Sequence, residues 1–308
     1  MATSGELICR GVTLCDFTKY EVFGNDYLVI DRLRSSLAMT PRIASLVAHR
    51  KQGIGADGIL WGPFPESSGI RLKVYNADGS ECPRSGNGIR VFAHYLRKQG
   101  YVREDQFSIR TAENVSPVEI IGMDTAMVKV GLGYFSPDSH AIRAKGDRRE
   151  MMREVLQIGG RHLTISCVSN GAPHCIVFRN ELPNDLEDSI GPLISNSPIF
   201  PEGINVAVVE VKDRRTITAE LWERGAGAVP SSGSAAAAAA FIVHLLGYVD
   251  SNVAVQMQGG TLSVSISSSR EASIAGMVQH VAEGVFSASF RSMLEQDDES
   301  RPLAKSQQ

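Results

Sequence analysis

Two stretches of the chain carry the hydrophobic spacing of helices, and each follows a Ser-Gly pair. In the first stretch, apolar residues recur with the spacing of one helix face: Ile89, Phe92, Ala93 and Leu96. The turn-rich run Ser85-Gly86-Asn87-Gly88 precedes them, and Gly100 stands where such a helix would end. A helix that begins there presents free backbone N–H groups, so the pattern predicts a site for a carboxylate or a phosphate.

The second predicted helix runs through six alanines, from Ala235 to Leu246. Ser232-Gly233-Ser234 precedes it and Gly247 follows it. Ser85 lies nine residues after Asn76, and Ser232 lies nine residues after Glu223 (85 − 76 and 232 − 223). The matched spacing indicates an internal duplication, with two half-domains that each present a helix N-terminus to a shared cleft. The alternative is that both are glycine-rich helix starts with ordinary serine caps.

Runs of β-branched and alternating apolar residues predict strands throughout the chain, at 27–30, 71–75, 107–111, 126–130, 161–169, 206–211, 216–223, 253–258, 262–266, 272–277 and 283–286. Turn composition places a domain boundary near residue 133. We therefore expect an N-terminal half of residues 1–133 with about 281–291, a C-terminal half of 134–280, and a flexible polar tail of 292–308. The charged residues 140–155 predict an inserted surface segment.

Composition narrows the function classes. The chain has 308 residues with 43% hydrophobic content, enough for about two domains, and a net charge of −3 without a basic run that would bind nucleic acid. No apolar stretch has the length of a membrane span, the N-terminus lacks a secretory pattern, and the five cysteines have no paired or zinc-type spacing. The glycines of residues 53–58 lack the strand–loop–helix unit of a dinucleotide site. We therefore expect a cytoplasmic protein that binds neither nucleic acid, membrane nor metal.

Several motifs, taken together and in order, resemble diaminopimelate epimerase and the related cofactor-independent amino-acid racemases. The matching pieces are Gly24-Asn25-Asp26, Gly53-Ile54-Gly55-Ala56-Asp57-Gly58, Asn76-Ala77-Asp78-Gly79-Ser80-Glu81, Ser85-Gly86-Asn87-Gly88, Pro173-His174, Gly203-Ile204-Asn205, Glu223-Arg224-Gly225, Gly227 and Ser232-Gly233. They cover roughly residues 15 to 288. The resemblance implies an α/β (α+β) fold of two pseudo-symmetric domains. Each would be a curved, mostly antiparallel sheet around a central helix, with the active-site cleft between them.

The resemblance also implies a reaction without a cofactor. In that family two cysteines remove and return the α-proton from opposite sides, while two helix N-termini bind the α-carboxylate. The positions that match the cysteines are Ser85 and Ser232, so the resemblance makes these serines the catalytic candidates. A serine alcohol is a much weaker acid than a thiol and needs a helper. His174 is the candidate helper, and the alternative for it is a turn histidine satisfied by the backbone.

Further matching positions imply contacts with an amino-acid substrate. Backbone N–H groups for its carboxylate would come from Gly86, Asn87, Gly233 and Ser234, and its other polar groups would be held by Asn25, Asn76, Asn205, Glu223 and Arg224. The alternative for Arg224 is an ion pair with Glu223. Members of this family often dimerise, so a homodimer is expected from the resemblance alone.

Two departures from the family pattern change the expected substrate. Ala172 replaces the usual Asn before Pro-His, and Ala228-Val229 replaces Glu-Thr. The loss of an amide and a carboxylate favours a substrate smaller or less polar than diaminopimelate. Two alternatives to an epimerase therefore stay open: an amino-acid-binding protein without catalysis, and a dehydratase or double-bond isomerase on the same fold. Cys82 could supply a displaced thiol, although Cys82 and Cys175 fit better as inert packed side chains.

Overall fold

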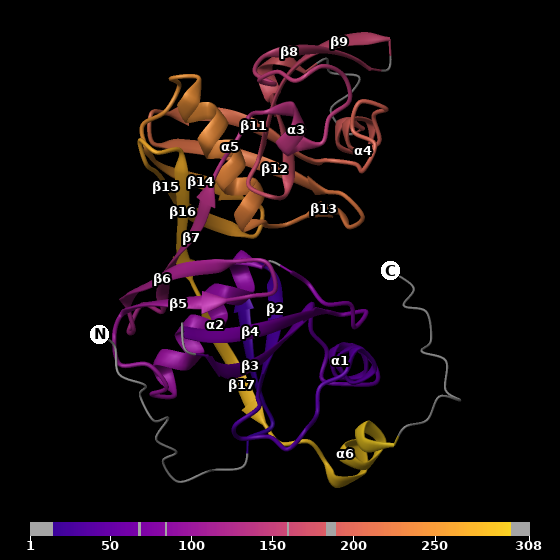
Figure 1. The fold of residues 1–308 in the computed structure, drawn as a ribbon, viewed down its shortest axis with the longest axis vertical. Helices are drawn as coiled ribbons and strands as arrows, with labels where there is room; N and C mark the ends of the chain where they lie inside the picture. Colours follow the sequence, from indigo (N-terminus) through magenta and orange to yellow (C-terminus); the bar gives the residue numbers. More distant parts are fainter. Residues whose placement is uncertain (1–14, 67–68, 84, 159, 183–188, 297–308) are drawn as a thin grey trace. The chain divides into compact units, whose positions relative to one another are not determined.

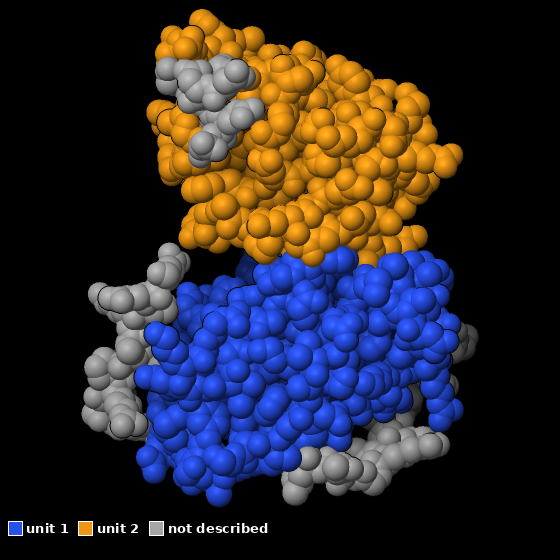
Figure 2. Space-filling model, turned by 180° about the vertical axis from the view of Figure 1, so that it is seen from behind, with its two compact units in different colours: residues 1–128, 277–308 blue, residues 129–276 orange. Residues whose placement is uncertain are grey.

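The computed structural model describes residues 15–66, 69–83, 85–158, 160–182 and 189–296. The chain forms two compact units (Figures 1 and 2): unit 1 comprises residues 1–128 and 277–308, and unit 2 comprises residues 129–276. The two crossings between units therefore come five and four residues before the predicted boundaries at 133 and 280.

Unit 1 contains, in chain order, β1 (Phe17–Val22), β2 (Asn25–Asp31), α1 (Pro41–Ala48), β3 (Gly58–Glu66), β4 (Gly69–Asn76), α2 (Gly86–Lys98), β5 (Gln106–Arg110), β6 (Val115–Gly122), the start of β7 (Met127–Tyr134), β17 (Gln279–Gly284) and α6 (Ala288–Glu295). β2 runs parallel to β3 and β4 parallel to β5, whereas β1–β2, β3–β4, β5–β6 and β1–β17 are antiparallel. The helix α2 packs against β1, β2, β3 and β6.

Unit 2 contains α3 (Ser139–Ile142), β8 (Glu154–Ile158), β9 (Arg161–Ser169), β10 (Pro173–Phe178), the short 3₁₀ turn η1 (Arg179–Glu181), α4 (Ile190–Ser195), β11 (Asn205–Asp213), β12 (Thr216–Glu223), β13 (Gly227–Val229), α5 (Gly233–Leu245), β14 (Asn252–Met257), β15 (Gly260–Ile266) and β16 (Glu271–Met277). Its pairing pattern repeats that of unit 1. β10–β11 and β12–β14 are parallel, and the pairs β9–β10, β11–β12 and β14–β15 are antiparallel.

The repeat is exact in register as well as in order. β11, β12 and α5 begin and end 147 residues after β3, β4 and α2 (205 against 58, 216 against 69, 233 against 86). Tyr27 lies opposite Gly58, and His174 lies opposite Asn205, with the same offset. Even the bridge between Tyr75 and Glu81 has its counterpart in the pairing of Trp222 with Ala228 on β12 and β13. The internal duplication predicted from the two Ser-Gly pairs is therefore present in the fold.

Each unit is organised around its buried helix (Figure 1). All six alanines of α5 are at most 1% exposed, because strands β9 to β12, β14 and β15 contact the helix. Alanine side chains let strands approach the helix axis closely on every side, so a helix that is apolar all round becomes a central one. In α2 the same enclosure also buries two polar side chains, Arg90 and His94.

Three sequence expectations are wrong in part. Residues 140–155 are mostly exposed, as predicted, but Ile142, Ala144 and Met151 are buried in the core of unit 2, so the segment is part of the fold of that unit. The tail predicted from residue 292 begins too early, because α6 extends to Glu295 and buries Leu294; residues 297–308 lie outside the described part of the chain. The last strand, predicted at 283–286, is β17 at Gln279–Gly284. Among the described residues, none of the helices has both the length and the apolar character needed to cross a membrane.

Candidate functional site

The site in unit 1 is the N-terminus of α2, which Ser85 caps. Ser85 has an extended backbone (φ −147°), and its Oγ accepts a hydrogen bond from the Gly88 N–H at 3.0 Å. A Cβ at Gly88 would lie 2.9 Å from Leu60 Cδ2 and 3.0 Å from Ser85 Oγ, so glycine leaves room for the cap. The cap uses the N–H of Gly88, and the N–H groups of Gly86 and Asn87 precede the first bonds of the helix. This end of α2 is therefore suited to bind an anion.

A chain of amides and charges fixes this helix start. Asn87 is buried, and its Nδ2 donates to Asn25 Oδ1 at 3.0 Å. Asn87 Oδ1 accepts from Arg90 Nη2 at 2.6 Å. The structure thus brings together three of the predicted residues, Ser85, Asn87 and Asn25, but it uses both ends of the Asn87 amide internally. Only the backbone N–H of Asn87 remains for the predicted role in carboxylate binding.

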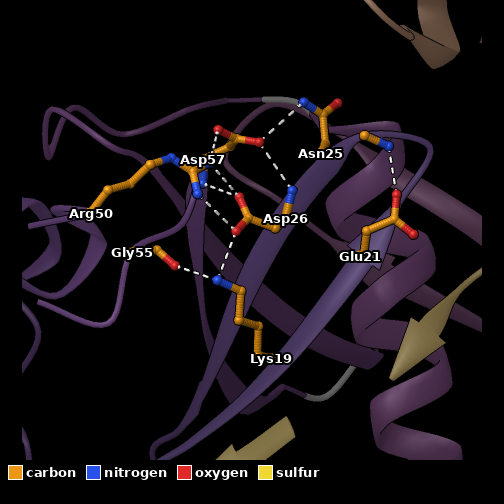
Figure 3. Close-up of polar contacts among 8 residues, drawn as sticks. Lys19, Glu21, Asn25, Asp26, Arg50, Gly55 and Asp57 are labelled. Atoms are coloured by element: carbon orange, nitrogen blue, oxygen red, sulfur yellow. Dashed lines mark hydrogen bonds and ion pairs between the residues drawn. The ribbon is translucent and has the colours of Figure 1, made fainter. Parts of the chain in front are cut away.

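A cluster of four ionised side chains holds Asn25 from the other side (Figure 3). Asp57 Oδ2 accepts from Asn25 Nδ2 at 3.4 Å and from the Asp26 N–H at 3.0 Å. Arg50 donates to both Asp26 and Asp57, and Lys19 Nζ lies 2.8 Å from Asp26 Oδ2. Burial opposes ionisation of Asp26, yet hydrogen bonds from Arg50 and Lys19 lower its pKa to about 2. The glycines of residues 53–58 thus lead to Asp57, a carboxylate that helps to position Asn25.

Asp26 should make this cluster sensitive to acid. Because the folded-state pKa is depressed, ionised Asp26 stabilises the fold above about pH 4, and this contribution is lost as the pH falls toward about 2. We expect the difference in Tm between the unsubstituted protein and Asp26→Asn to shrink over that interval. Asp124→Asn, at an exposed aspartate in a turn, is the control. A difference that stays constant from about pH 5 to about pH 2 would contradict this assignment.

Asn76 ends β4 and begins the turn that leads to Ser85. Its Nδ2 donates to Ser80 Oγ at 2.9 Å, and Asp78 Oδ1 accepts from the Ser80 N–H at 2.8 Å. The Asn76 side chain is exposed. In this arrangement the amide nitrogen stabilises its own turn, while the amide oxygen is left for the predicted substrate contact.

The site in unit 2 is the corresponding end of α5, which Ser232 caps. Ser232 Oγ accepts from the Ala235 N–H at 3.5 Å and lies 3.5 Å from Ser234 Oγ. Ser232 and Gly233 are both buried. The N–H groups of Gly233 and Ser234 precede the first hydrogen bonds of the helix. The longer cap distance makes this hydroxyl less tightly held than that of Ser85.

The predicted partners of Ser232 lie on the strands beside α5. His174 is buried on β10, opposite Asn205 on β11. Asn205 Oδ1 accepts from the backbone N–H of Arg224 at 3.1 Å, so Asn205 fixes the end of β12. Glu223 is half-buried beside it. Arg224 Nη1 donates to Glu202 O at 3.0 Å, and among the described residues Arg224 makes no ion pair with Glu223.

Comparison with known proteins shows the family of the chain. The profile of the family described as "Diaminopimelate epimerase" matches residues 17–136 and 166–281. Diaminopimelate epimerase 2 from Nostoc sp. is 38% identical over 273 residues, which cover 88% of this chain and 95% of that protein. The chain belongs to the diaminopimelate epimerase family.

Solved structures extend the same fold to more distant members. A probable proline racemase from Agrobacterium radiobacter superposes with a TM-score of 0.63 at 12% identity and covers 90% of this chain and 94% of its own. Methylitaconate-delta-isomerase superposes with a TM-score of 0.62 at 11% identity and covers 94% of this chain and 99% of its own. At such identities the similarity concerns the fold alone. The predicted α/β architecture with two sheet-and-helix halves is thus confirmed for this member of the diaminopimelate epimerase family.

Within this family framework, the sequence reasoning missed two residues at the α2 site. The Tyr27 hydroxyl lies 3.2 Å from Ser85 Oγ, and Arg90 is fully buried behind the helix start. The signal for Tyr27 was present in the repeat, because Tyr27 precedes Ser85 by 58 residues and His174 precedes Ser232 by 58 residues. The helper predicted for unit 2 therefore has a structural counterpart in unit 1.

Neither Cys82 nor Cys175 caps one of the two central helices. Cys175 is fully buried and pairs across the strands with Cys167, whose pKa is raised by burial. Cys82 is half-buried, and its N–H donates to Val74 O at 2.8 Å. Serine hydroxyls therefore occupy the two helix caps, as the family resemblance had indicated for Ser85 and Ser232.

Proposed function

We propose that the protein is a cofactor-independent isomerase that removes and returns the α-proton of an amino acid. Ser85 and Ser232 supply the two proton-transfer groups, one from each unit. The observation that carries this proposal is their equivalence: each serine caps a buried helix at the same position of a register-exact repeat. Membership of the diaminopimelate epimerase family supports the reaction class.

The helix N-termini would bind the substrate carboxylate. Gly86 and Asn87 in unit 1, and Gly233 and Ser234 in unit 2, offer backbone N–H groups that no helical carbonyl accepts. The positive end of each helix dipole favours a carboxylate there and would favour the carbanionic intermediate more strongly, because negative charge spreads onto the carboxylate oxygens as the α-proton leaves. No cofactor is needed for that stabilisation.

The part of the site that would hold the far end of the substrate is less polar than the family pattern. Arg224 Nε and Nη2 have no hydrogen-bond partner among the described residues, so they could donate to an acceptor group at the far end of the substrate. Glu223 could accept from a donor group there. Alanine at positions 172 and 228 removes an amide and a carboxylate that the family pattern includes. We therefore propose an amino acid smaller or less polar than diaminopimelate, with Asn25, Asn76 and Asn205 as further contacts.

The cellular setting is proposed on the same basis. The described cysteines Cys15, Cys82, Cys167 and Cys175 are all free thiols, which supports a reducing, cytoplasmic environment. A homodimer stays a prediction from the family and is tested by light scattering of the purified chain.

Solvent deuterium incorporation tests the proposed reaction. The purified protein is incubated in D₂O with the protein amino acids, 4-hydroxyproline and diaminopimelate, and Cα deuterium is measured by NMR. We expect incorporation into at least one of them, lowered about 10-fold or more in Ser232→Ala, because one proton-transfer group is lost. Ser231→Ala, one residue before the cap, is the matched control and should keep the full rate.

The competing functions give different results in the same assay. An amino acid that raises the Tm but never acquires deuterium would indicate a binding protein without catalysis, as the absence of both thiols would suggest. A product lighter by one water would identify a dehydratase. No binding and no exchange with any of these compounds would reject the proposed function.

A further inference from the structure

The short contact between Tyr27 and Ser85 addresses the weakest point of a serine-based epimerase. An alcohol is a poor acid at neutral pH, whereas a phenol, with an ordinary pKa near 10, is a far better one. The Tyr27 hydroxyl lies 3.2 Å from Ser85 Oγ, and either atom can donate. Ser85 Oγ also accepts from the Gly88 N–H. When Tyr27 donates as well, the serine proton is directed away from the helix cap.

Arg90 provides a buried positive charge beside this pair. Its side chain is fully buried, its Nη2 donates to Asn87, and its guanidinium lies 5.2 Å from the centre of the Phe23 ring. Its Nε and Nη1 have no hydrogen-bond partner among the described residues. Burial lowers the pKa of Arg90 to about 10, and the electrostatic effect of Tyr27 acts in the opposite direction. Charge on Tyr27 and charge on Arg90 therefore stabilise each other. Such a cation would stabilise a transient tyrosinate.

We infer that Tyr27 is a positioning and proton-relay residue that acts through Ser85, with Arg90 as the counter-ion of its ionised form. When Cα is protonated, the carbanion electron pair forms the Cα–H bond and the Ser85 Oγ–H bond breaks. The proton of Tyr27 moves to Ser85 Oγ, which leaves tyrosinate beside Arg90. In the opposite direction the reaction starts from tyrosinate: Ser85 Oγ takes the Cα proton while its own proton passes to Tyr27. Between turnovers Tyr27 exchanges its proton with solvent, which restores the form that each direction needs.

The repeat supports this role independently of the contact. Tyr27 and His174 occupy equivalent positions, each 58 residues before the serine that caps the adjacent helix. Both are side chains that can exchange a proton in water. The two serines would thus each have a proton partner, phenol in unit 1 and imidazole in unit 2. This inference rests on the proposed function, and it names the group that lets Ser85 donate a proton to Cα.

A double-substitution experiment tests the relay. We expect Tyr27→Phe to lower kcat for α-deuterium exchange about 10- to 100-fold, with KM unchanged, because the phenol supplies the proton and does not bind substrate. In a Ser85→Cys background the same change should cost about 2-fold or less, since a thiol is acidic enough alone. A role in packing alone would give equal losses in both backgrounds, and that result would overturn the relay.

Tyr20→Phe is the matched control. Tyr20 lies directly opposite Tyr27 on β1, is fully buried, and its hydroxyl has no partner among the described residues. Removing that hydroxyl should leave exchange unchanged. Full exchange in Tyr27→Phe would overturn the relay and leave the proposed function standing. If the unsubstituted protein is inactive while the variant with both Ser85→Cys and Ser232→Cys is active, the relay is overturned; if both proteins are inactive, the proposed function falls with it.

Discussion

Replacing both Ser85 and Ser232 with cysteine is expected to raise the rate of α-proton exchange by about 100-fold or more. A thiol has a pKa near 8.5 in water, and a helix N-terminus lowers it further, so a reactive thiolate becomes accessible at neutral pH. Each serine side chain accepts a hydrogen bond from an N–H in the first turn of the helix that it caps, Gly88 for Ser85 and Ala235 for Ser232. The same N-terminal field acts on an alcohol but is worth at most about 2 kcal/mol, too little to ionise it.

The rate is measured as deuterium incorporation into the amino acid that the unsubstituted protein exchanges fastest, and into diaminopimelate. Ser231→Cys is the control, because its hydroxyl is buried one residue before the cap and has no partner among the described residues. A thiol there should bring no gain. If the double variant were no faster than Ser231→Cys, the caps would not be the sites of proton transfer.

Gly79→Ala is expected to have the largest effect on stability, a loss of about 3 kcal/mol or more. Gly79 sits in the turn between Asn76 and Ser85 with φ +88°, and an added Cβ would lie 2.1 Å from Pro41 O. The substitution therefore combines backbone strain with a collision against the first residue of α1, and neither can relax without moving the turn.

Gly225→Ala separates the two causes. Gly225 has nearly the same backbone angle, φ +85°, but no atom lies within 4 Å of the added Cβ. We expect it to cost only about 1 kcal/mol, the strain alone. Urea unfolding of both variants measures the difference. Equal losses would show that the turn can move away from Pro41.

The sequence predicts the two central helices because each carries its signals within one segment. A capping serine, apolar residues at helical spacing and a terminal glycine together define α2 and α5 to within a few residues. It also predicts most strands, whose apolar runs are continuous. The sequence does not reveal β6, because Pro117 and Glu119 interrupt its apolar pattern, and it does not reveal the buried residues within 140–155, because they follow no helix or strand period.

The candidate site divides in the same way. Ser85, Ser232 and the residues around them follow from local motifs and from the family resemblance. The contact of Tyr27 with Ser85 joins residues on different elements, and Tyr27 alone is indistinguishable from any aromatic residue of a buried strand. Asp57 was attributed to a glycine pattern, and only the structure shows that it holds Asn25. Long-range pairing decides these contacts, so no periodicity within one segment could reveal them.

The equal length of the two copies has a practical consequence for protein engineering. From Tyr27 to the end of α2, and from His174 to the end of α5, the copies differ in side chains but not in residue count, so side chains can be transplanted from one copy to the other. Exchanging Tyr27 and His174 would place an imidazole where the phenol was and a phenol where the imidazole was. For each of the two capping serines, the other half of the chain thus provides an equivalent position with different neighbours for comparison.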